Sequence, residues 1–180
     1  MSPHSNRAVF FDRDGVLIEA PVRSGRPAAI RSVDHLSLTR DAAAVCGELN
    51  ELGIPLFVFT NQPDVKRGLT TRYVVEQINT AMAGTLGITE VAVSWSDSDE
   101  DPTFKPNPGM LLELADKHGI DLQASVVVGD RWRDIVAGQR AGCKTVFIDR
   151  GYAERAPDGA DLTVKELGDA LDWMREQLER

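Results

Sequence analysis

The sequence predicts an α/β fold: a doubly wound, Rossmann-like parallel sheet with helices on both faces. Short apolar runs alternate with amphipathic stretches along the 180 residues, an order that is typical of parallel α/β sheets. The apolar runs are continuous, as expected for strands that helices cover on both sides. Glycine follows the last turn of four expected helices, at Gly53, Gly87, Gly119 and Gly142.

The alternation predicts five strands and five helices. The strands are expected at residues 8–11, 54–60, 91–95, 125–128 and 145–148. The helices are expected at residues 41–52, 71–86, 108–118, 132–141 and 164–178. Two segments do not fit: residues 19–38 are expected to form a projecting loop or hairpin, and residues 96–107 an acidic polar loop. Neither a repeat nor a flexible linker divides the chain, so we expect one domain over residues 1–180.

Composition indicates a soluble globular protein, since 42% of the residues are hydrophobic and 27% are charged. A net charge of -8 argues against binding to nucleic acids or anionic membranes, and no apolar run reaches membrane-spanning length. Cys46 and Cys143 are expected to be buried thiols in a reducing compartment. The first seven residues have no long apolar stretch. We therefore expect no secretory signal, a cytoplasmic protein, and a monomer or small homo-oligomer.

Two carboxylates, Asp12 and Asp14, directly follow the first expected strand and precede Gly15. Residues i and i+2 of a strand share a face, so both can point at one ligand from the mouth of a parallel sheet. Two acids this close repel each other unless one is protonated or a cation lies between them. From this run alone, an acidic turn remains as good an interpretation as a functional site.

Three further segments place polar groups at the same edge of the expected sheet. Thr60 and Asn61 end the second strand, Lys105 precedes a helix, and Asp130 and Asp134 follow the fourth strand. Acids, a hydroxyl and a lysine together suit phosphoryl transfer, in which positioning and charge neutralisation do most of the catalysis. Hard oxygen ligands without histidine or cysteine indicate Mg²⁺ rather than zinc.

These four segments, in this order, resemble the motifs of the haloacid dehalogenase (HAD) superfamily of phosphatases. The resemblance runs over nearly the whole chain. Each motif is weak alone, but four of them next to expected strands and helices are a specific signal. The intervals from Asp12 to Thr60 and from Thr60 to Lys105 leave no room for a separate cap domain. The chain therefore resembles the capless branch of the superfamily.

The resemblance implies a role for each residue of the reaction centre. Asp12 would attack phosphorus and carry an aspartyl-phosphate intermediate. Asp14 would protonate the leaving oxygen and then activate water. Thr60 and the amide of Asn61 would hold the phosphoryl oxygens, and Lys105 would neutralise both the phosphoryl group and the nucleophile.

The resemblance also implies a magnesium site and a main-chain contact. Asp130 would ligate Mg²⁺ together with Asp12 and the carbonyl of Asp14, and Asp134 would support the metal or the lysine. Arg13 would bind substrate through its backbone amide more than through its side chain. Other interpretations stay open for three residues: Thr60 as a strand cap, Asp134 as an acid at a helix N-terminus, and Trp132 as a packing residue.

Within the superfamily, the four segments are most similar to the heptose-bisphosphate and histidinol-phosphate phosphatases. Two departures matter for the substrate. The segment from Ser94 to Phe104 has none of the cysteines and histidines of their zinc loop, so we expect no zinc. Phe104 stands where they carry an arginine, so a second phosphate loses one expected partner. The acidic run from Asp97 to Asp101 is expected to be a solvated loop; if it lies near the site instead, it would disfavour a second anionic group.

We therefore expect a Mg²⁺-dependent phosphatase of a small phosphorylated metabolite, most simply a sugar phosphate. Two alternatives remain at this stage. A non-catalytic receiver-like phospho-sensing domain also uses clustered acids with a threonine and a lysine, but its phosphorylated aspartate ends a later strand. A phosphatase of polynucleotide ends is disfavoured by the pI near 4.9.

Overall fold

The computed structural model describes residues 6–179 and contains a six-stranded, all-parallel sheet. The strand order is β5-β4-β1-β6-β7-β8, which places β1 near the centre. The strands of the sheet are β1 (Val9–Phe11), β4 (Leu56–Asn61), β5 (Glu90–Ser94), β6 (Val126–Gly129), β7 (Lys144–Ile148) and β8 (Leu162–Val164).

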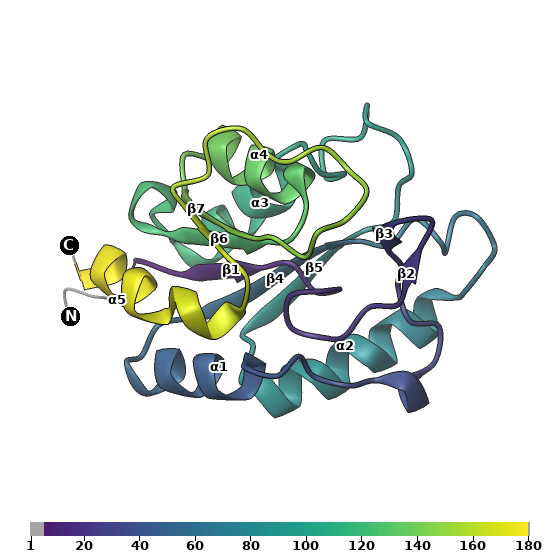
Figure 1. The fold of residues 1–180 in the computed structure, drawn as a ribbon, viewed down its shortest axis with the longest axis horizontal. Helices are drawn as coiled ribbons and strands as arrows, with labels where there is room; N and C mark the ends of the chain where they lie inside the picture. Colours follow the sequence, from purple (N-terminus) through teal and green to yellow (C-terminus); the bar gives the residue numbers. More distant parts are fainter. Residues whose placement is uncertain (1–5, 180) are drawn as a thin grey trace.

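Helices cover both faces of the sheet (Figure 1). One face carries α1 (Ala42–Glu51), α2 (Arg72–Leu86) and α5 (Leu171–Glu179), and the other carries α3 (Gly109–His118) and α4 (Trp132–Ala141).

The core is split by the sheet into two clusters. Phe11 and Val58 belong to the cluster with α1, α2 and α5, whereas their neighbours Phe10 and Phe57 pack with α3 and α4. Successive side chains of a strand point to opposite faces, and here both faces are buried. This explains why the strands read as continuous apolar runs, and it confirms the doubly wound α/β prediction.

The expected strands and the first four expected helices agree with the structure to within two residues at each end. The single helix expected over residues 164–178 is wrong. The segment begins with the end of β8 and continues in a 3-10 helix at Leu167–Ala170. The α-helix of this segment, α5, begins only at Leu171. β8 is a three-residue edge strand that pairs only with β7. Such a short run carries too few residues for its period to be read from the sequence.

The carboxyl ends of all six strands lie at one edge of the sheet, because the strands are parallel. Beyond this edge, the segment at residues 19–38 forms the expected hairpin, from β2 (Val22–Arg23) and β3 (Arg26–Pro27). Figure 1 shows this hairpin on the right of the view, on the side of the molecule opposite to α5. The hairpin thus stands where polar side chains from several strands converge.

Both cysteines are buried and unpaired, as expected. Burial raises the pKa of the Cys46 thiol and of the Cys143 thiol to about 12. Among residues 6–179, no helix has the length and apolarity that a bilayer crossing requires. The expectation about a secretory signal falls largely on residues 1–5, which lie outside the described residues.

Candidate active site

A cavity of about 1380 Å³ lies at the carboxyl edge of the sheet. Asp12 follows β1, Thr60 and Asn61 end β4, and Lys105 comes from the loop between β5 and α3. The structure brings most of the expected site residues to this one cavity. Those that line it are Asp12, Asp14, Thr60, Asn61, Lys105 and Asp134.

Lys105 lies at the centre of the site, and only 3% of its surface is exposed. Its Nζ is 2.7 Å from Asp12 Oδ1 and 2.8 Å from Asp134 Oδ1, and it also donates to the carbonyl of Phe59 at 3.0 Å. Burial by itself would lower the pKa of Lys105, but the two carboxylates outweigh burial and raise it. The lysine is therefore a fixed positive charge between two acids.

Asp12 and Asp130 are both held in unfavourable surroundings for a negative charge. Burial, opposed by Lys105 and reinforced by Asp134 and Asp14, raises the pKa of Asp12 to about 6. Burial and the neighbouring carboxylates also raise the pKa of Asp130 well above its usual value. Lys105 offsets part of this cost, but among the described residues Asp130 forms no ion pair, so a bound cation would stabilise its negative charge.

The carboxylates of Asp12, Asp130 and Asp134 lie close enough together to bind a metal cation. Each of the three offers one oxygen, and these atoms all lie within 4.8 Å of one another. Asp130 Oδ2 accepts a hydrogen bond from the Tyr152 hydroxyl at 2.7 Å, whereas its buried Oδ1 has no partner among the described residues. A free buried oxygen and an all-oxygen donor set fit a hard divalent cation such as Mg²⁺. The Asp14 carboxylate is not part of this cluster, and ligation by its carbonyl stays a prediction.

Gly15 allows Asp130 to approach the loop after β1. Its φ is +85°, a left-handed conformation that favours glycine, and an added Cβ would lie 2.1 Å from Asp130 Oδ2. The glycine after the two acids therefore makes room for the carboxylate that comes from β6.

The Asp14 carboxylate is oriented from two sides. Arg13 contacts it at 3.1 Å, and Gln62 Nε2 donates to Asp14 Oδ2 at 2.9 Å and also to Thr60 Oγ1 at 2.9 Å. The Arg13 side chain is fully buried and donates to Asn79 Oδ1 at 2.8 Å. Its guanidinium therefore orients Asp14 and does not line the cavity.

The Asn61 side chain holds the segment that carries the lysine. Its Oδ1 accepts from the Lys105 backbone N–H at 3.1 Å, and its Nδ2 donates to the Lys105 carbonyl at 3.3 Å. Arg133 Nη1 donates to the same carbonyl at 2.8 Å. The Asn61 side chain is thus occupied, and the contact of its backbone amide with a phosphoryl oxygen stays a prediction.

Asp134 makes two kinds of contact, because its two oxygens face different groups. Oδ2 accepts from the Arg131 backbone N–H at 3.0 Å and caps α4, while Oδ1 contacts Lys105. These contacts are compatible with both interpretations of Asp134, and its support of the metal or the lysine during the reaction stays a prediction. Trp132 packs against two guanidinium groups, with Arg155 at 3.7 Å and Arg133 at 4.7 Å from its ring centre.

Sequence reasoning missed Tyr152, Gln62 and Asn79 as parts of the site. Gln62 directly follows Thr60 and Asn61 in the sequence, but its hydrogen bond to Asp14 depends on the turn after β4. Asn79 is a buried amide within the apolar face of α2, and a polar residue at such a position was the one available signal. Tyr152 lies in a loop after β7 with no periodicity or motif, so no signal for it was available.

Comparison with known proteins agrees with this geometry. Residues 103–170 match a family described as HAD-hydrolase-like. The D-glycero-beta-D-manno-heptose-1,7-bisphosphate 7-phosphatase of Mesorhizobium japonicum is 31% identical over 180 residues, which cover 91% of this chain and 80% of the relative. The Escherichia coli K12 enzyme of the same name is 28% identical over 186 residues, 94% of each chain.

A solved structure extends the similarity to the fold. The D,D-heptose 1,7-bisphosphate phosphatase of B. bronchiseptica, solved with magnesium and phosphate, has a TM-score of 0.80 at 21% identity. The match covers 96% of this chain and 99% of the other. With the matches in sequence, this chain belongs to the HAD-like hydrolases and is a phosphatase of that superfamily.

Proposed function

We propose that this chain is a Mg²⁺-dependent phosphatase of a sugar phosphate, similar to a heptose bisphosphate, which acts through an aspartyl phosphate on Asp12. The observation that carries the proposal is the contact of Lys105 with both Asp12 and Asp134, next to the unpartnered Oδ1 of Asp130. The heptose-bisphosphate phosphatases among the relatives support the substrate class.

The first step is attack by Asp12 on phosphorus. Lys105 contacts Oδ1 of Asp12 at 2.7 Å, so the other oxygen is the one available to form the new bond to phosphorus. As the bond between phosphorus and the leaving oxygen breaks, Asp14 donates a proton to that oxygen. The Thr60 hydroxyl accepts from Gln62, which leaves its own proton to bind a phosphoryl oxygen.

The second step reverses the role of Asp14. Its carboxylate takes a proton from water as the water oxygen attacks phosphorus, and the bond to Asp12 breaks to release inorganic phosphate. Gln62 and Arg13 keep the Asp14 carboxylate oriented in both steps. Bound Mg²⁺, held by Asp12 and Asp130, would neutralise charge on the phosphoryl group.

We also propose one catalytic domain without a separate cap and without structural zinc. The acidic loop at residues 96–107 is held by hydrogen bonds where its relatives are expected to use zinc. Asn107 Nδ2 donates to the carbonyls of Asp99 and Asp101, both at 2.8 Å, and Thr103 Oγ1 donates to Asp101 Oδ1 at 2.6 Å. The loop therefore has an internal scaffold of its own.

A cytoplasmic location stays a prediction.

A panel of phosphate esters tests the proposed substrate class. With Mg²⁺ present, purified protein should release inorganic phosphate from heptose and hexose phosphates with higher kcat/KM than from phosphorylated oligonucleotide ends. If only the oligonucleotide ends are hydrolysed, the proposed sugar phosphate substrate is wrong and the enzyme is a polynucleotide-end phosphatase. Lasting phosphorylation of the protein by acetyl phosphate, without phosphate release, would contradict a phosphatase and favour a phospho-sensing domain.

A further inference from the structure

The far wall of the cavity is built from the β2–β3 hairpin and the loop after β7, and the two are joined. The Ala153 backbone N–H donates to the Gly25 carbonyl at 2.8 Å. Gly25 has φ +72°, and an added Cβ would lie 2.4 Å from the Ala153 Cβ. This close approach needs glycine at the tip of the hairpin, so the hairpin has a defined position over the cavity.

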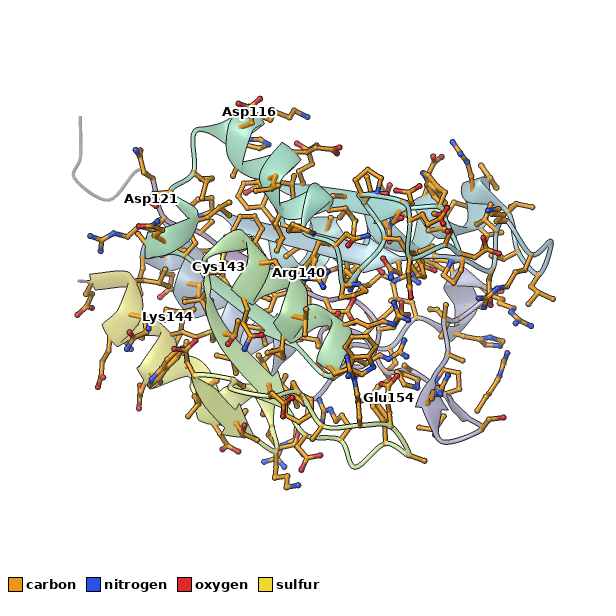
Figure 2. All side chains as sticks on the ribbon, turned by 90° about the horizontal axis from the view of Figure 1, so that it is seen from above. Asp116, Asp121, Arg140, Cys143, Lys144 and Glu154 are labelled. Atoms are coloured by element: carbon orange, nitrogen blue, oxygen red, sulfur yellow. The ribbon has the colours of Figure 1, made fainter. Side chains whose placement is uncertain are left out.

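The same loop reaches the proposed metal site. Tyr152, the residue before Ala153, donates its hydroxyl to Asp130. Glu154 accepts from Arg131, at the first turn of α4, with contacts of 2.9 and 2.5 Å. Figure 2 shows Glu154 between the start of α4 and the hairpin. These hydrogen bonds therefore fix the position of the far wall relative to the carboxylates of the proposed reaction centre.

Three exposed guanidinium groups line this wall: Arg23, Arg26 and Arg155. Among the described residues, no carboxylate lies within ion-pair distance of any of them. Arg155 stacks on the Trp132 ring at 3.7 Å, which orders its guanidinium without neutralising it. Arg26 also helps to lower the pKa of the nearby Glu154 carboxyl, but that carboxylate is already paired with Arg131. Arginines that form no ion pair of their own, gathered in a cavity, are a binding surface for an anion.

Two acids of the run at residues 97–101 that line the cavity are already paired, and Glu100 is the third acid of the run that lines it. Asp97 pairs with Lys66 at 2.6 Å, and Asp99 pairs with Arg133 at 2.6 Å. The acidic run does line the cavity, but these two acids already have cationic partners. The Arg133 guanidinium also lies 5.7 Å from the ring centre of Phe104, the residue that stands in place of the arginine expected from the resemblance.

We propose that Arg23, Arg26 and Arg155 form a second anion subsite, which binds a distal phosphate group of the substrate while the scissile phosphate lies at Asp12. This inference rests on the proposed function, because it assigns that enzyme a bisphosphate. Guanidinium groups present paired donors that match phosphate oxygens. The subsite lies on the hairpin and the β7 loop, away from the position of Phe104.

Equilibrium binding tests the subsite separately from turnover. Calorimetry would measure fructose 1,6-bisphosphate and fructose 6-phosphate on the full chain carrying Asp12→Asn, which does not consume the ligand. Adding Arg26→Gln or Arg155→Gln should weaken bisphosphate binding by about tenfold or more per arginine, the loss expected for a hydrogen bond to a charged group. Monophosphate binding should weaken by much less, and Arg26→Lys should restore part of the loss.

Arg40→Gln is the matched control, because Arg40 has an 84% exposed side chain and does not line the cavity. It should leave the ratio of the two affinities unchanged. Equal weakening of both ligands by the Arg26 and Arg155 variants, or no weakening, would overturn the subsite. Failure of the wild-type chain to hydrolyse any phosphate ester would instead overturn the proposed function, and the affinity ratio would still decide the subsite.

Discussion

Asp12→Asn will reduce turnover of p-nitrophenyl phosphate by about 10⁴-fold or more, since loss of a covalent nucleophile removes the reaction path and not merely a contact. The amide is nearly the same size as the carboxylate and keeps an oxygen that can accept from Lys105. Steady-state kinetics with saturating Mg²⁺ measures the loss. KM should change little compared with kcat.

The control for this variant is Asp116→Asn, the same change at an exposed acid on α3 (Figure 2). It should retain wild-type turnover. Asp12→Asn activity within tenfold of the wild type would show that a different group attacks phosphorus. Far-ultraviolet circular dichroism of both variants separates a chemical loss from a folding defect.

Asp130→Asn will abolish the response to Mg²⁺ and will stabilise the metal-free protein. Burial and neighbouring carboxylates raise the pKa of Asp130 in the folded state, so its ionised form costs stability at neutral pH. An asparagine has no charge to bury and can still accept from Tyr152. We expect metal-free unfolding to require roughly 1–3 kcal/mol more in the variant at pH 7, as for relief of a poorly satisfied buried group.

The sign of the pH dependence follows from the same pKa shifts. The pKa of Asp12 rises from 3.8 to about 6 on folding, so the folded state binds more protons than the unfolded state between these two pH values. Ionisation of Asp12 therefore lowers the free energy of unfolding of the metal-free wild type as pH rises from about 4 to about 6. Above about pH 6 this loss of stability is complete. Asp130 acts in the same direction, so the advantage of Asp130→Asn should grow as pH rises.

Thermal unfolding in chelator and in Mg²⁺ measures both effects. The Tm of the wild type should rise when Mg²⁺ is added, and the Tm of Asp130→Asn should not change. Activity of the variant should fall by more than the roughly 10–100-fold that is typical when an outer partner of a metal ligand is lost. A variant that is less stable than the wild type in chelator, yet still stabilised by Mg²⁺, would contradict the assignment of Asp130 as a ligand. Asp116→Asn again serves as the control.

The sequence predicted the scaffold of the site well, because that scaffold depends on local patterns. Continuous apolar runs located β1, β4 and β6, and an acid or a threonine at the end of each strand was enough to place these residues at one edge. The helix after β8 was misplaced because a three-residue edge strand has no measurable period.

The surroundings of the site depended on contacts between distant residues and could not be predicted. Tyr152 reaches Asp130 across 22 residues of sequence, and Arg133 reaches Asp99 across 34. The pairing of the acidic loop with Lys66 and Arg133 could not be predicted, because these partners belong to other elements. Side-chain pairing of this kind leaves no local pattern, and it changes the expected charge of the cavity.

Trapping the intermediate tests the central claim most directly. In Asp14→Asn, an aryl phosphate can still transfer its phosphoryl group, because its leaving group needs little protonation, but attack by water lacks its base. Rapid mixing with p-nitrophenyl phosphate and Mg²⁺, followed by borohydride reduction, converts an aspartyl phosphate to homoserine. Peptide mass spectrometry should find homoserine at position 12 and none in Asp12→Asn. Homoserine at another aspartate, or a burst of p-nitrophenol with none at all, would contradict the account.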